Sequence, residues 1–438
     1  MFMIDINLIR TKPEWVAEQL AKRGIAVDFT KLLKLDEQKR KLQTLTELRK
    51  AERNRVSADI ARLKQQGGDT ATLITAMQAL GAKIEKAGDA RIAKFEEDIL
   101  NILAALPNIP LPEVVAGGKE NNKAVKTFGK QPRFDFKPKD HVELCTSLGL
   151  IDYERGAKLS GAGTWVYTGL GAQLEWALLN YFIDFHITNG YTFIMPPYLL
   201  NWESGYAAGQ FPKFADEVFI TNFDKDPKKS KFLLPTAETA LLNMHRNEII
   251  PADNLPIKYA GYSACFRNEA AGYGSKERGT IRGYQFNKIE MFIFCSAEDS
   301  EKLHQEVTRN AEKLVEGLGL HYQTVALAAG DLGPVMAKTS DIEVFIPSFG
   351  YKEVSSCSNA LDYQARRANV KTKTHVCDDK GCRMVNEFVH TLNASGLATS
   401  RLIPAIVEQF QQADGSVVIP AVLHRYMHGT KVLSKHCK

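Results

Sequence analysis

Arginine and glutamate residues recur at close spacing between residues 264 and 292, in a stretch that alternates in polarity around a glycine-rich break. Arg267 and Glu269 stand two apart at its start, Arg282 follows the break, and Glu290 ends a second alternating run. This pattern predicts two strands joined as a hairpin, with residues two apart on the same face. Such a face can offer a guanidinium to a phosphate and a carboxylate to an amine, although an exposed charged hairpin is the simpler interpretation of an isolated Arg-x-Glu pair.

The order of residues in this stretch is more specific than its charges. It reads Phe-Arg-x-Glu-Ala from Phe266, Arg-Gly-x-Ile-Arg from Arg278, and Gln-Phe-x-Lys-x-Glu-Met from Gln285. This order resembles motif 2 of the class II aminoacyl-tRNA synthetases, and that of the seryl-tRNA synthetases in particular. The resemblance implies that Arg267 clamps the α-phosphate of ATP and that Phe286 stacks on adenine.

Other residues of the stretch receive roles from the same resemblance. Arg282 would neutralise the outer phosphates, and Glu269 would meet the nucleotide or the terminal adenosine of a tRNA. Lys276 and Arg278 would contact the acceptor end of the tRNA, or would simply be solvated loop charges. The ATP-binding set that the resemblance implies is Arg267, Asn268, Glu269, Arg282, Phe286, Glu353, Val354, Ser355, Ser356 and Arg401.

The family resemblance also implies a pocket for serine at the triplet Thr236-Ala237-Glu238, which in isolation would be no more than a helix cap or a turn. The free ammonium of an amino acid needs carboxylate partners, and a small hydroxyl side chain needs hydrogen-bonding groups in a tight pocket. Two buried carboxylates in one pocket are reasonable only where a cation is expected. The implied serine-binding residues are Thr236, Ala237, Glu238, Arg267, Glu290, Asn393 and Ser395.

Two downstream segments complete the resemblance. The run Glu353-Val354-Ser355-Ser356 resembles a strand of the family, and it implies that Glu353 and Ser356 share a Mg²⁺ with phosphate oxygens. Residues 391–401 resemble motif 3, with Arg401 at the start of a helix. The catalytic set is then Arg267, Glu353 and Arg401. Motif 3 departs from the commonest pattern in having Ala394 and Ser400 where glycine is usual, and both are small enough to pack similarly.

A possible metal cluster is formed by His375, Cys377, Cys382 and His390. The C-x₄-C spacing lies at the edge of structural zinc patterns. Free thiols on a loop are the simpler interpretation, and the family resemblance does not require zinc.

The N-terminal quarter of the chain predicts helices that would carry a basic surface. Good helix formers run from Leu32 to Gln66, Gly67-Gly68 interrupts them, and an apolar seam resumes from Leu73 to Ile102 with a one-residue slip. Two long helices around a tight turn indicate an antiparallel coiled coil at about residues 31–103. Residues 31–66 hold eleven Lys/Arg against five Asp/Glu, a net charge of +6. The whole chain carries +5, so the remainder is near neutral at −1. The segment is therefore either a solvated spacer or a surface for a polyanion; the resemblance favours an arm that holds the serine tRNA.

The domain boundary is expected at Pro107, Pro110 and Pro112, which rule out a continuing helix. The domains are then 1–112, a helical tRNA-binding arm, and 113–438, a catalytic domain with motifs 1, 2 and 3. Residues 3–23 are expected to form one helix, and residues 119–133 a linker. A helix at 172–190 and a strand at 191–195 resemble motif 1, which implies a homodimer.

Composition limits the class of protein. At 438 residues, two domains are the default. The apolar runs are too short to span a bilayer, and the first residues lack the basic head and apolar core of a secretory signal. Seven scattered cysteines fit a reducing cytoplasm better than a disulfide framework. After Arg401 only 37 residues remain (438 − 401), so no anticodon-binding domain is expected there.

The expected fold class is α+β: an antiparallel sheet with flanking helices, preceded by a coiled-coil arm. The expected activity is ATP-dependent ligation of serine to its tRNA through a seryl-adenylate, and whether a selenocysteine tRNA is also served is left open. Two alternatives remain. One is a ligase that loads an amino acid onto a carrier protein, whose known members lack the arm; the other is a catalytically altered tRNA-binding paralogue.

Overall fold

The computed structural model describes residues 3–84, 88–221, 226, 229–268, 279–378 and 381–435, except for the side chains of residues 82, 83 and 375–378. By internal contacts the chain separates into two units. The helical unit holds residues 1–21 and 25–107, and the sheet unit holds residues 22–24 and 108–438.

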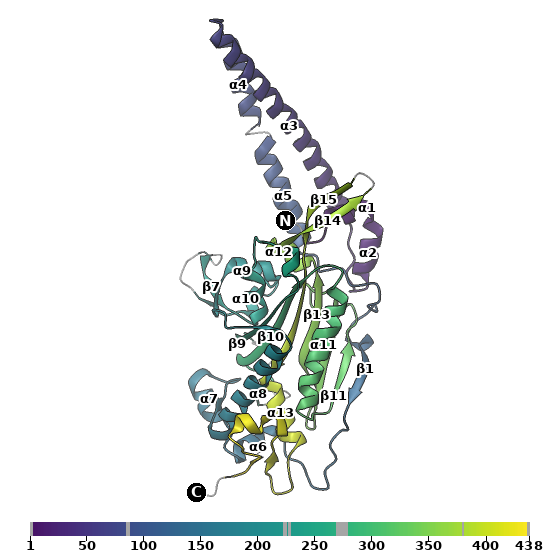
Figure 1. The fold of residues 1–438 in the computed structure, drawn as a ribbon, viewed down its shortest axis with the longest axis vertical. Coiled ribbons are helices and arrows are strands. Elements are labelled where there is room, and N and C mark those ends of the chain that lie inside the picture. The colour runs from purple at the N-terminus through teal and green to yellow at the C-terminus, as the bar shows by residue number, and fades with distance from the viewer. Residues whose placement is uncertain are drawn as a thin grey trace. The chain divides into compact units, whose positions relative to one another are not determined.

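Long helices make up the helical unit. The helices are α1 (Ile6–Thr11), α2 (Pro13–Ala21), α3 (Thr30–Gln65), α4 (Ala71–Ile84) and α5 (Ala90–Ala104). Figure 1 shows α3 running beside α4 and α5. The predicted helical hairpin is therefore confirmed: α3 ends just before Gly67, whose φ of 75° is readily adopted by glycine. The one-residue slip in the apolar seam coincides with the interval between α4 and α5.

The prediction of one helix over residues 3–23 is wrong. Lys12, with φ −141°, separates α1 from α2, and Pro13 begins the second helix. Asp5 caps α1 by accepting a hydrogen bond from the backbone N–H of Asn7. Arg10 of α1 then reaches α3, where two of its nitrogens donate to the buried carboxylate of Asp36 at 2.7 and 2.6 Å.

An eight-stranded sheet forms the centre of the sheet unit. All its neighbouring strands pair antiparallel except β4, which lies parallel to β9 at one edge. In spatial order the strands are β1 (Lys123–Phe128), β11 (Tyr322–Ala326), β12 (Lys338–Ile346), β13 (Gly350–Leu361), β16 (His390–Ala398), β10 (Gln285–Cys295), β9 (Ile257–Phe266) and β4 (Thr192–Ile194).

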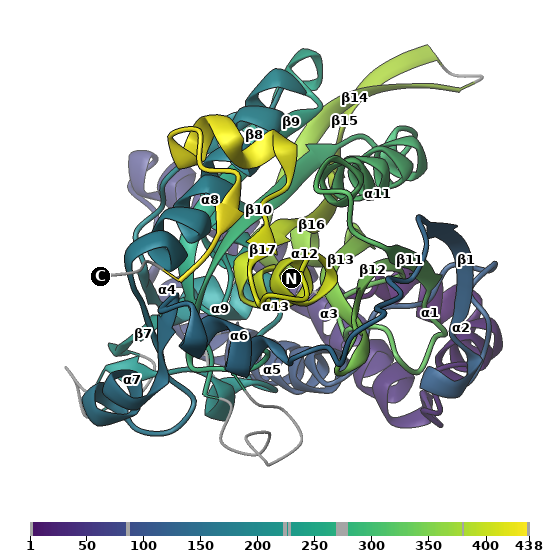
Figure 2. The same ribbon diagram turned by 90° about the horizontal axis from the view of Figure 1, so that it is seen from below.

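Helices cover both faces of this sheet. One face packs against α8 (Gly169–Thr188), α11 (Ser300–Gly317) and α13 (Thr399–Gln409), and Figure 2 shows α13 in front of the central strands. The other face packs against α9 (Trp202–Ala208), α10 (Ala237–Asn243) and α12 (Tyr363–Ala368). Strand β10 shows the expected alternation, because Met291 and Ile293 enter the first cluster whereas Phe292 and Phe294 enter the second.

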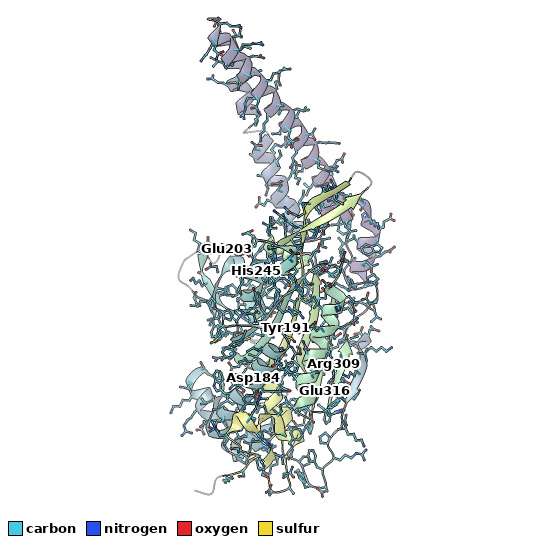
Figure 3. The ribbon with its side chains drawn as sticks, in the orientation of Figure 1. Asp184, Tyr191, Glu203, His245, Arg309 and Glu316 are labelled. Carbon is cyan, nitrogen blue, oxygen red and sulfur yellow. The ribbon has the colours of Figure 1, made fainter. Side chains whose placement is uncertain are left out.

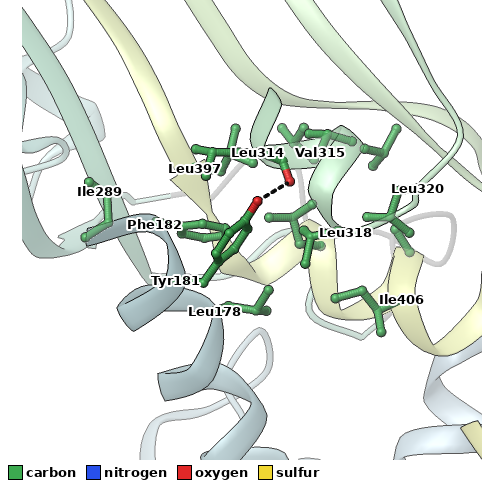
Figure 4. Close-up of a cluster of buried hydrophobic side chains, with 14 of the residues drawn as sticks. Leu178, Tyr181, Phe182, Ile289, Leu314, Val315, Leu318, Leu320, Leu397 and Ile406 are labelled. Atoms are coloured by element: carbon green, nitrogen blue, oxygen red, sulfur yellow. Dashed lines mark hydrogen bonds between the residues drawn. The ribbon is translucent and has the colours of Figure 1, made fainter. Parts of the chain in front are cut away.

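The larger cluster joins helices that are distant in sequence. In Figure 4, Tyr181 of α8 points towards α11, where its hydroxyl donates to the carbonyl of Leu314 at 3.4 Å. Burial raises the pKa of Tyr181 to about 12, so the hydroxyl remains a donor. Leu397 of β16 and Ile406 of α13 belong to the same cluster, so α8, α11 and α13 pack together against this face of the sheet.

The expected linker at residues 119–133 is in part a strand. Residues 123–128 form β1, which pairs with β11 at the edge of the main sheet. Its side chains are mostly exposed, so its sequence lacks the apolar alternation that marks a half-buried strand. Pairing with β11, and not the composition of the segment itself, therefore orders it.

A charged network joins this edge to α11. Lys126 of β1 lies between Glu312 and Glu316, and Arg309 donates to both oxygens of Glu316 at 2.6 and 2.7 Å. Figure 3 shows Arg309 and Glu316 side by side. Chiefly because of Arg309, the pKa of Glu316 is lowered to about 2.

Smaller elements surround the main sheet. They are α6 (His141–Ser147), α7 (Tyr153–Ser160), the pair β2 (Ile151–Asp152) and β3 (Val166–Tyr167), the sheet β5 (Leu199–Asn201), β7 (Lys231–Leu233) and β6 (Ile220–Thr221), the sheet β15 (Gly381–Phe388), β14 (Lys371–Asp378) and β8 (Ile249–Ile250), and the pair β17 (Val417–Val418) and β18 (Val432–Leu433). Among the described residues, none of the helices is both long and apolar enough to cross a membrane.

Candidate functional site

The antiparallel hairpin of β9 and β10 frames the site, as the alternating pattern predicts. Phe286, Lys288 and Glu290 lie at even positions of β10, on the face that also carries Phe292 and Phe294. The connecting residues 269–278 are outside the described part of the chain. The expected roles of Glu269, Lys276 and Arg278 are therefore not addressed by the structure.

Two cavities adjoin at this face. The larger has a volume of about 700 Å³ and the smaller about 80 Å³. Arg267 and Arg282 line both, so the two cavities form one continuous site divided by guanidinium groups. The larger cavity is also lined by Thr236, Glu238 and Asn268, and the smaller by Phe286, Lys288, Glu353, Val354, Ser395, Ser400 and Arg401.

The Thr236-Ala237-Glu238 triplet begins helix α10. Thr236 is the N-cap, and Ala237 is fully buried in the core cluster of that face. Glu238, in the first helical turn, accepts a hydrogen bond from Gln364 at 2.6 Å. Burial, with the neighbouring charge of Glu290, raises the pKa of Glu238 to about 7. The carboxylate of Glu238 is thus held in the cavity by a neutral amide, and it forms no ion pair with a described residue.

Lys288 is a site residue that the sequence analysis did not select. Its ammonium donates to the hydroxyl of Thr236 at 2.8 Å and forms an ion pair with Glu290. It also lowers the pKa of Glu238, opposing the effect of burial. Its position two residues before Glu290 was the available signal, since residues two apart in a strand share a face.

Strand β16 brings motif 3 alongside β10. Ser395 lies opposite Glu290, and Asn393, which is buried, lies opposite Phe292. The side chain of Asn393 forms a hydrogen bond with Glu238. The two residues expected to bind serine from motif 3 are therefore on the strand that faces both pocket carboxylates.

Arg267 stands between the two cavities. Its Nε donates to the carbonyl of Pro235 at 3.3 Å, and its guanidinium lies 5.2 Å from the centre of the Phe286 ring. A cation over an aromatic face is attracted by the ring, so this contact orients the guanidinium. The next residue, Asn268, is fixed through its backbone N–H, which donates to the carbonyl of Glu217 at 2.8 Å.

Arg401 lies in the first turn of α13 and reaches β13. Its Nη1 donates to the carbonyl of Glu353 at 2.6 Å and lies 3.7 Å from the Glu353 carboxylate. Its Nε donates to the carbonyl of Ile281 at 3.3 Å. Of the unusual residues in motif 3, Ala394 is fully buried, and the carbonyl of Ser400 accepts a hydrogen bond from Thr280 at 2.7 Å. Ala394 is thus packed in the core opposite Met291, and Ser400 is held next to Arg401 in the chain.

A β-bulge explains how Glu353 and Ser356 can act together. In a regular strand, residues three apart point to opposite faces. Strand β13, however, changes register at Val354, because Ser355 pairs with Ile342 and Glu353 pairs with Glu343. Val354 and Cys357 both enter the core cluster, which leaves Glu353 and Ser356 on the other face.

Asp341 on β12 is a second residue that the sequence analysis missed. It lies opposite Ser356 and forms a hydrogen bond with it. Burial, with the nearby charge of Glu353, raises the pKa of Asp341 to about 8. A cation that bound here would favour its ionised form, so the oxygen-rich set of Glu353, Ser356 and Asp341 suits a hard ion such as Mg²⁺. Ser355 takes another role and donates to the carbonyl of Ser395 at 2.6 Å.

The possible zinc cluster lies in part outside the described residues, so the structure does not test it. Cys377 and Cys382 are paired across β14 and β15, but the side chains of His375 and Cys377 are outside the described part. His390 lies on β16 opposite Cys295. Within the residues described, no three His, Cys, Asp or Glu side chains are grouped as metal ligands.

The arrangement combines two kinds of charge. The larger cavity is lined by Glu238 and Thr236, which suit an ammonium and a small polar group. At the smaller cavity Arg401 joins Arg267 and Arg282, which line both cavities, and the three suit phosphates. Such a site can hold an amino acid and a nucleotide with their reacting groups close together.

Two family models match the chain. The seryl-tRNA synthetase N-terminal domain matches residues 3–110, and the class II tRNA synthetase core domain of the G, H, P, S and T enzymes matches residues 219–410.

Curated relatives match along their whole length. Serine–tRNA ligase 2 of Clostridium acetobutylicum is 51% identical over 98% of this chain and 100% of its own. The serine–tRNA ligase of Carboxydothermus hydrogenoformans is 44% identical over 99% of this chain and 100% of its own.

Solved structures give the same result. Seryl-tRNA synthetase of Pyrococcus horikoshii, complexed with ATP, has a TM-score of 0.88 and 33% identity, covering 99% of this chain and 100% of that one. The cytoplasmic serine–tRNA ligase of Naegleria fowleri, in complex with AMP, has a TM-score of 0.83 and 28% identity, covering 99% of each chain.

Proposed function

Because the chain belongs to the seryl-tRNA synthetases, and is therefore an ATP-dependent serine–tRNA ligase of class II, we propose that its two cavities divide the reactants. The larger cavity holds serine and the smaller one holds the phosphates of ATP. The observation that carries this division is the separation of charge, with Glu238 on one side of Arg267 and Arg401 on the other.

Serine is bound by groups from three elements. Glu238 and Glu290 face its ammonium, and Thr236 and Asn393 supply hydrogen-bonding groups for the rest of the molecule. Ser395 reaches it from the adjoining smaller cavity, which it lines. Ala237 contributes only backbone, because its side chain is buried in the core. Arg267 directs the carboxylate of serine towards the α-phosphate, since its guanidinium adjoins both cavities.

In the activation step a serine carboxylate oxygen attacks the α-phosphorus of ATP, the new bond forms the seryl-adenylate, and pyrophosphate leaves. Arg267 stabilises the charge on the α-phosphate, whereas Arg282 and Arg401 neutralise the outer phosphates. Phe286 offers its ring to adenine. In the transfer step a hydroxyl of the terminal ribose of the tRNA forms an ester with the seryl group, and AMP leaves.

Mg²⁺ is the metal that this site suits. Glu353 and Ser356 would hold it, with Asp341 beside them, and it would neutralise phosphate charge. The bulge at Val354, which brings Glu353 and Ser356 to one face, supports this assignment.

The arm of residues 1–112 binds the serine tRNA, and residues 113–438 carry out catalysis. Support comes from the excess of positive charge on α3, because a polyanion is attracted to such a surface. Helix α8 and strand β4 form a homodimer contact. The exposed Trp176, Ile187 and Met195 supply apolar surface there, on the edge of the main sheet. The enzyme acts in the cytoplasm, where its substrates meet.

ATP–pyrophosphate exchange with each of the twenty amino acids tests the function. Serine supports the exchange best, because alanine leaves the hydroxyl partners unpaired and threonine adds a methyl group that a tight site excludes. A tRNA-charging assay follows. Exchange without charging would indicate a carrier-protein ligase, and the absence of exchange would indicate an altered paralogue. Preference for another amino acid would overturn the assignment of serine.

A further inference from the structure

One wall of the larger cavity is a short loop. Gly333, Pro334, Val335 and Met336 line it, and the same cavity is lined by Thr236 and Glu238. The loop has no helix or strand of its own, since it lies between β11 and β12. One turn hydrogen bond lies within it, because the backbone N–H of Met336 donates to the carbonyl of Gly333 at 3.0 Å, and contacts from elsewhere in the chain hold its carbonyls as well.

Arg23 binds this loop from outside. Its Nη1 donates to the carbonyls of Leu332 and Gly333 at 3.2 and 3.3 Å, and its Nη2 donates to the carbonyl of Met336. Arg23 comes from the three-residue segment Lys22–Gly24, which precedes α3 in sequence but belongs to the sheet unit. One guanidinium thus spans the loop from its first residue to its last.

Asn108 and Leu111 bind the carbonyls that Arg23 leaves. The backbone N–H of Asn108 donates to the carbonyl of Pro334 at 2.7 Å, and its Nδ2 donates to the carbonyls of Val335 and Ala360 at 2.9 and 2.8 Å. The backbone N–H of Leu111 donates to the carbonyl of Ala337 at 2.9 Å. Every carbonyl from residue 332 to residue 337 therefore accepts a hydrogen bond from residues 23, 108 or 111.

These contacts are costly if they serve stability alone. Burial lowers the pKa of Arg23 to about 10, and in the described part of the chain all its hydrogen bonds go to main-chain carbonyls. A buried cation that faces neutral acceptors gains less than one that faces a carboxylate. The side chain of Asn108 is also buried. The effect of Arg23 and Asn108 is to fix the geometry of the loop, because together they hold the five consecutive carbonyls of residues 332–336 in defined directions.

We propose that Arg23 and Asn108 are positioning residues that hold the Gly333–Met336 wall in the shape that serine binding requires. Neither residue touches the reactants; both act through the loop. The inference rests on the proposed location of serine in the larger cavity. ATP phosphates lie in the smaller cavity, so the clamp acts on serine and not on ATP.

Steady-state exchange kinetics test the clamp with Arg23→Gln, Arg23→Lys and Asn108→Asp. The KM for serine should rise about tenfold or more in Arg23→Gln and Asn108→Asp, because small displacements of a positioning group are costly. The KM for ATP should be unchanged. Arg23→Lys should recover part of the loss, since an ammonium can still reach some of the carbonyls. It is also the variant to use if the glutamine form does not fold.

A neighbouring residue supplies the matched control. Lys22 donates to the carbonyl of Pro112 at 3.0 Å and does not bind the wall. Lys22→Gln should leave both KM values unchanged. Thermal melting of each variant shows whether it is folded.

Two results would overturn the clamp. One is a folded Arg23→Gln and Asn108→Asp pair with an unchanged KM for serine; the other is an equal rise in both KM values. Exchange measured on the wild-type enzyme with each amino acid distinguishes either result from a failure of the proposed function. If another amino acid drives its exchange, the assignment of serine is wrong, and the clamp is then judged on the KM for that amino acid.

Discussion

Lys288 and Glu290, two residues apart on β10, form an ion pair in which their side chains are only 6% and 4% exposed. The pocket proposed for the ammonium of serine therefore contains a cation of its own. Glu290 is neutralised by it directly, whereas the more distant Glu238 retains a raised pKa. Serine binding is thus expected to depend on the protonation of Glu238 and on the charge of Lys288.

Replacing Lys288 with methionine should impair serine activation. The change removes the cation that lowers the pKa of Glu238, so this pKa should rise above about 7. The pH at which the KM for serine falls should move upwards, and kcat/KM at neutral pH should drop by about 10²-fold. Exchange measured across pH checks this. Lys258→Met is the control, because Lys258 of β9 pairs with Glu306 of α11. If the pH dependence of the KM for serine is the same in Lys288→Met as in the wild type, Lys288 does not set the pKa of Glu238.

The KM for serine in the wild type should fall as pH rises through about 7. Glu238 has a raised pKa of about 7, so its carboxyl is protonated below that value and charged above it. Only the charged form attracts an ammonium. By linkage, protonation of Glu238 stabilises the fold at low pH, and this contribution is lost as pH rises through about 7. Because Glu238→Gln lacks the carboxylate, it should bind serine weakly at every pH. A profile as steep as that of the wild type would assign the titration to another group.

Arg267→Ala should abolish exchange while leaving the fold intact. One charge-assisted partner of the transferring phosphate is lost, which by analogy with a lost oxyanion donor costs about 2.7–4 kcal/mol. Exchange kinetics and circular dichroism measure the two effects. Arg155→Ala is the control, because Arg155 is exposed and forms its ion pair with Asp152, away from both cavities. Near wild-type exchange in folded Arg267→Ala would remove Arg267 from the phosphate site.

Reversal of exposed basic residues on α3 should weaken tRNA binding. Lys39, Arg40 and Lys41 would be poor choices, because they pair with Glu96, Asp36 and Glu37 and their reversal would also disturb the arm.

Lys34, Arg55 and Lys64 are better targets, since they are exposed and form no ion pair with a described residue. The triple change to glutamate should reduce the slope of log affinity against log salt by about 0.7–0.9 for each lost phosphate contact, with exchange unaffected. Filter binding across salt concentrations measures the slope. Unchanged tRNA charging would mean that the arm is a spacer.

Arg309→Met should destabilise the protein at neutral pH more than at acid pH. The pKa of Glu316 is lowered to about 2, so its pairing stabilises the fold above its ordinary pKa of 4.5 and is lost as pH falls towards 2. Because Arg309 is 44% exposed, the loss should be no more than about 1 kcal/mol. Urea unfolding at several pH values checks this. Lys64→Met should show no such dependence, because Lys64 is exposed and forms no ion pair with a described residue.

Local patterns predicted the elements that carry the site. The alternation of β10 placed Phe286, Lys288 and Glu290 on one face, and Gly67 marked the turn of the helical hairpin. These predictions held because periodicity and turn residues report directly on backbone geometry. The assignment of roles to Arg267, Glu238 and Arg401 required the family resemblance, since short charged motifs are common.

Features that depend on distant contacts were not visible in the sequence. Strand β1 exists because β11 pairs with it, and its own residues resemble a linker. Asp341 lies opposite Ser356, and a bulge in the neighbouring strand β13 brings Glu353 to the same face as Ser356. Arg23 lies 309 to 313 residues from the loop carbonyls that it binds, the Asn108 side chain lies 227 residues from that of Val335, and nothing local to either residue indicates these contacts.

The sheet unit is made of two separate stretches of the chain, Lys22–Gly24 and Asn108–Lys438. Truncating the gene at one point therefore cannot yield this unit alone and complete. A protein started at residue 108 would lack Arg23 and would leave three loop carbonyls without their donor. Exchange of arms between relatives should therefore succeed when both crossovers fall within residues 25–107, and fail when the whole N-terminal segment is replaced by one with no arginine at this position. For recombination, the arm behaves as an insertion within the catalytic module and not as a detachable leader.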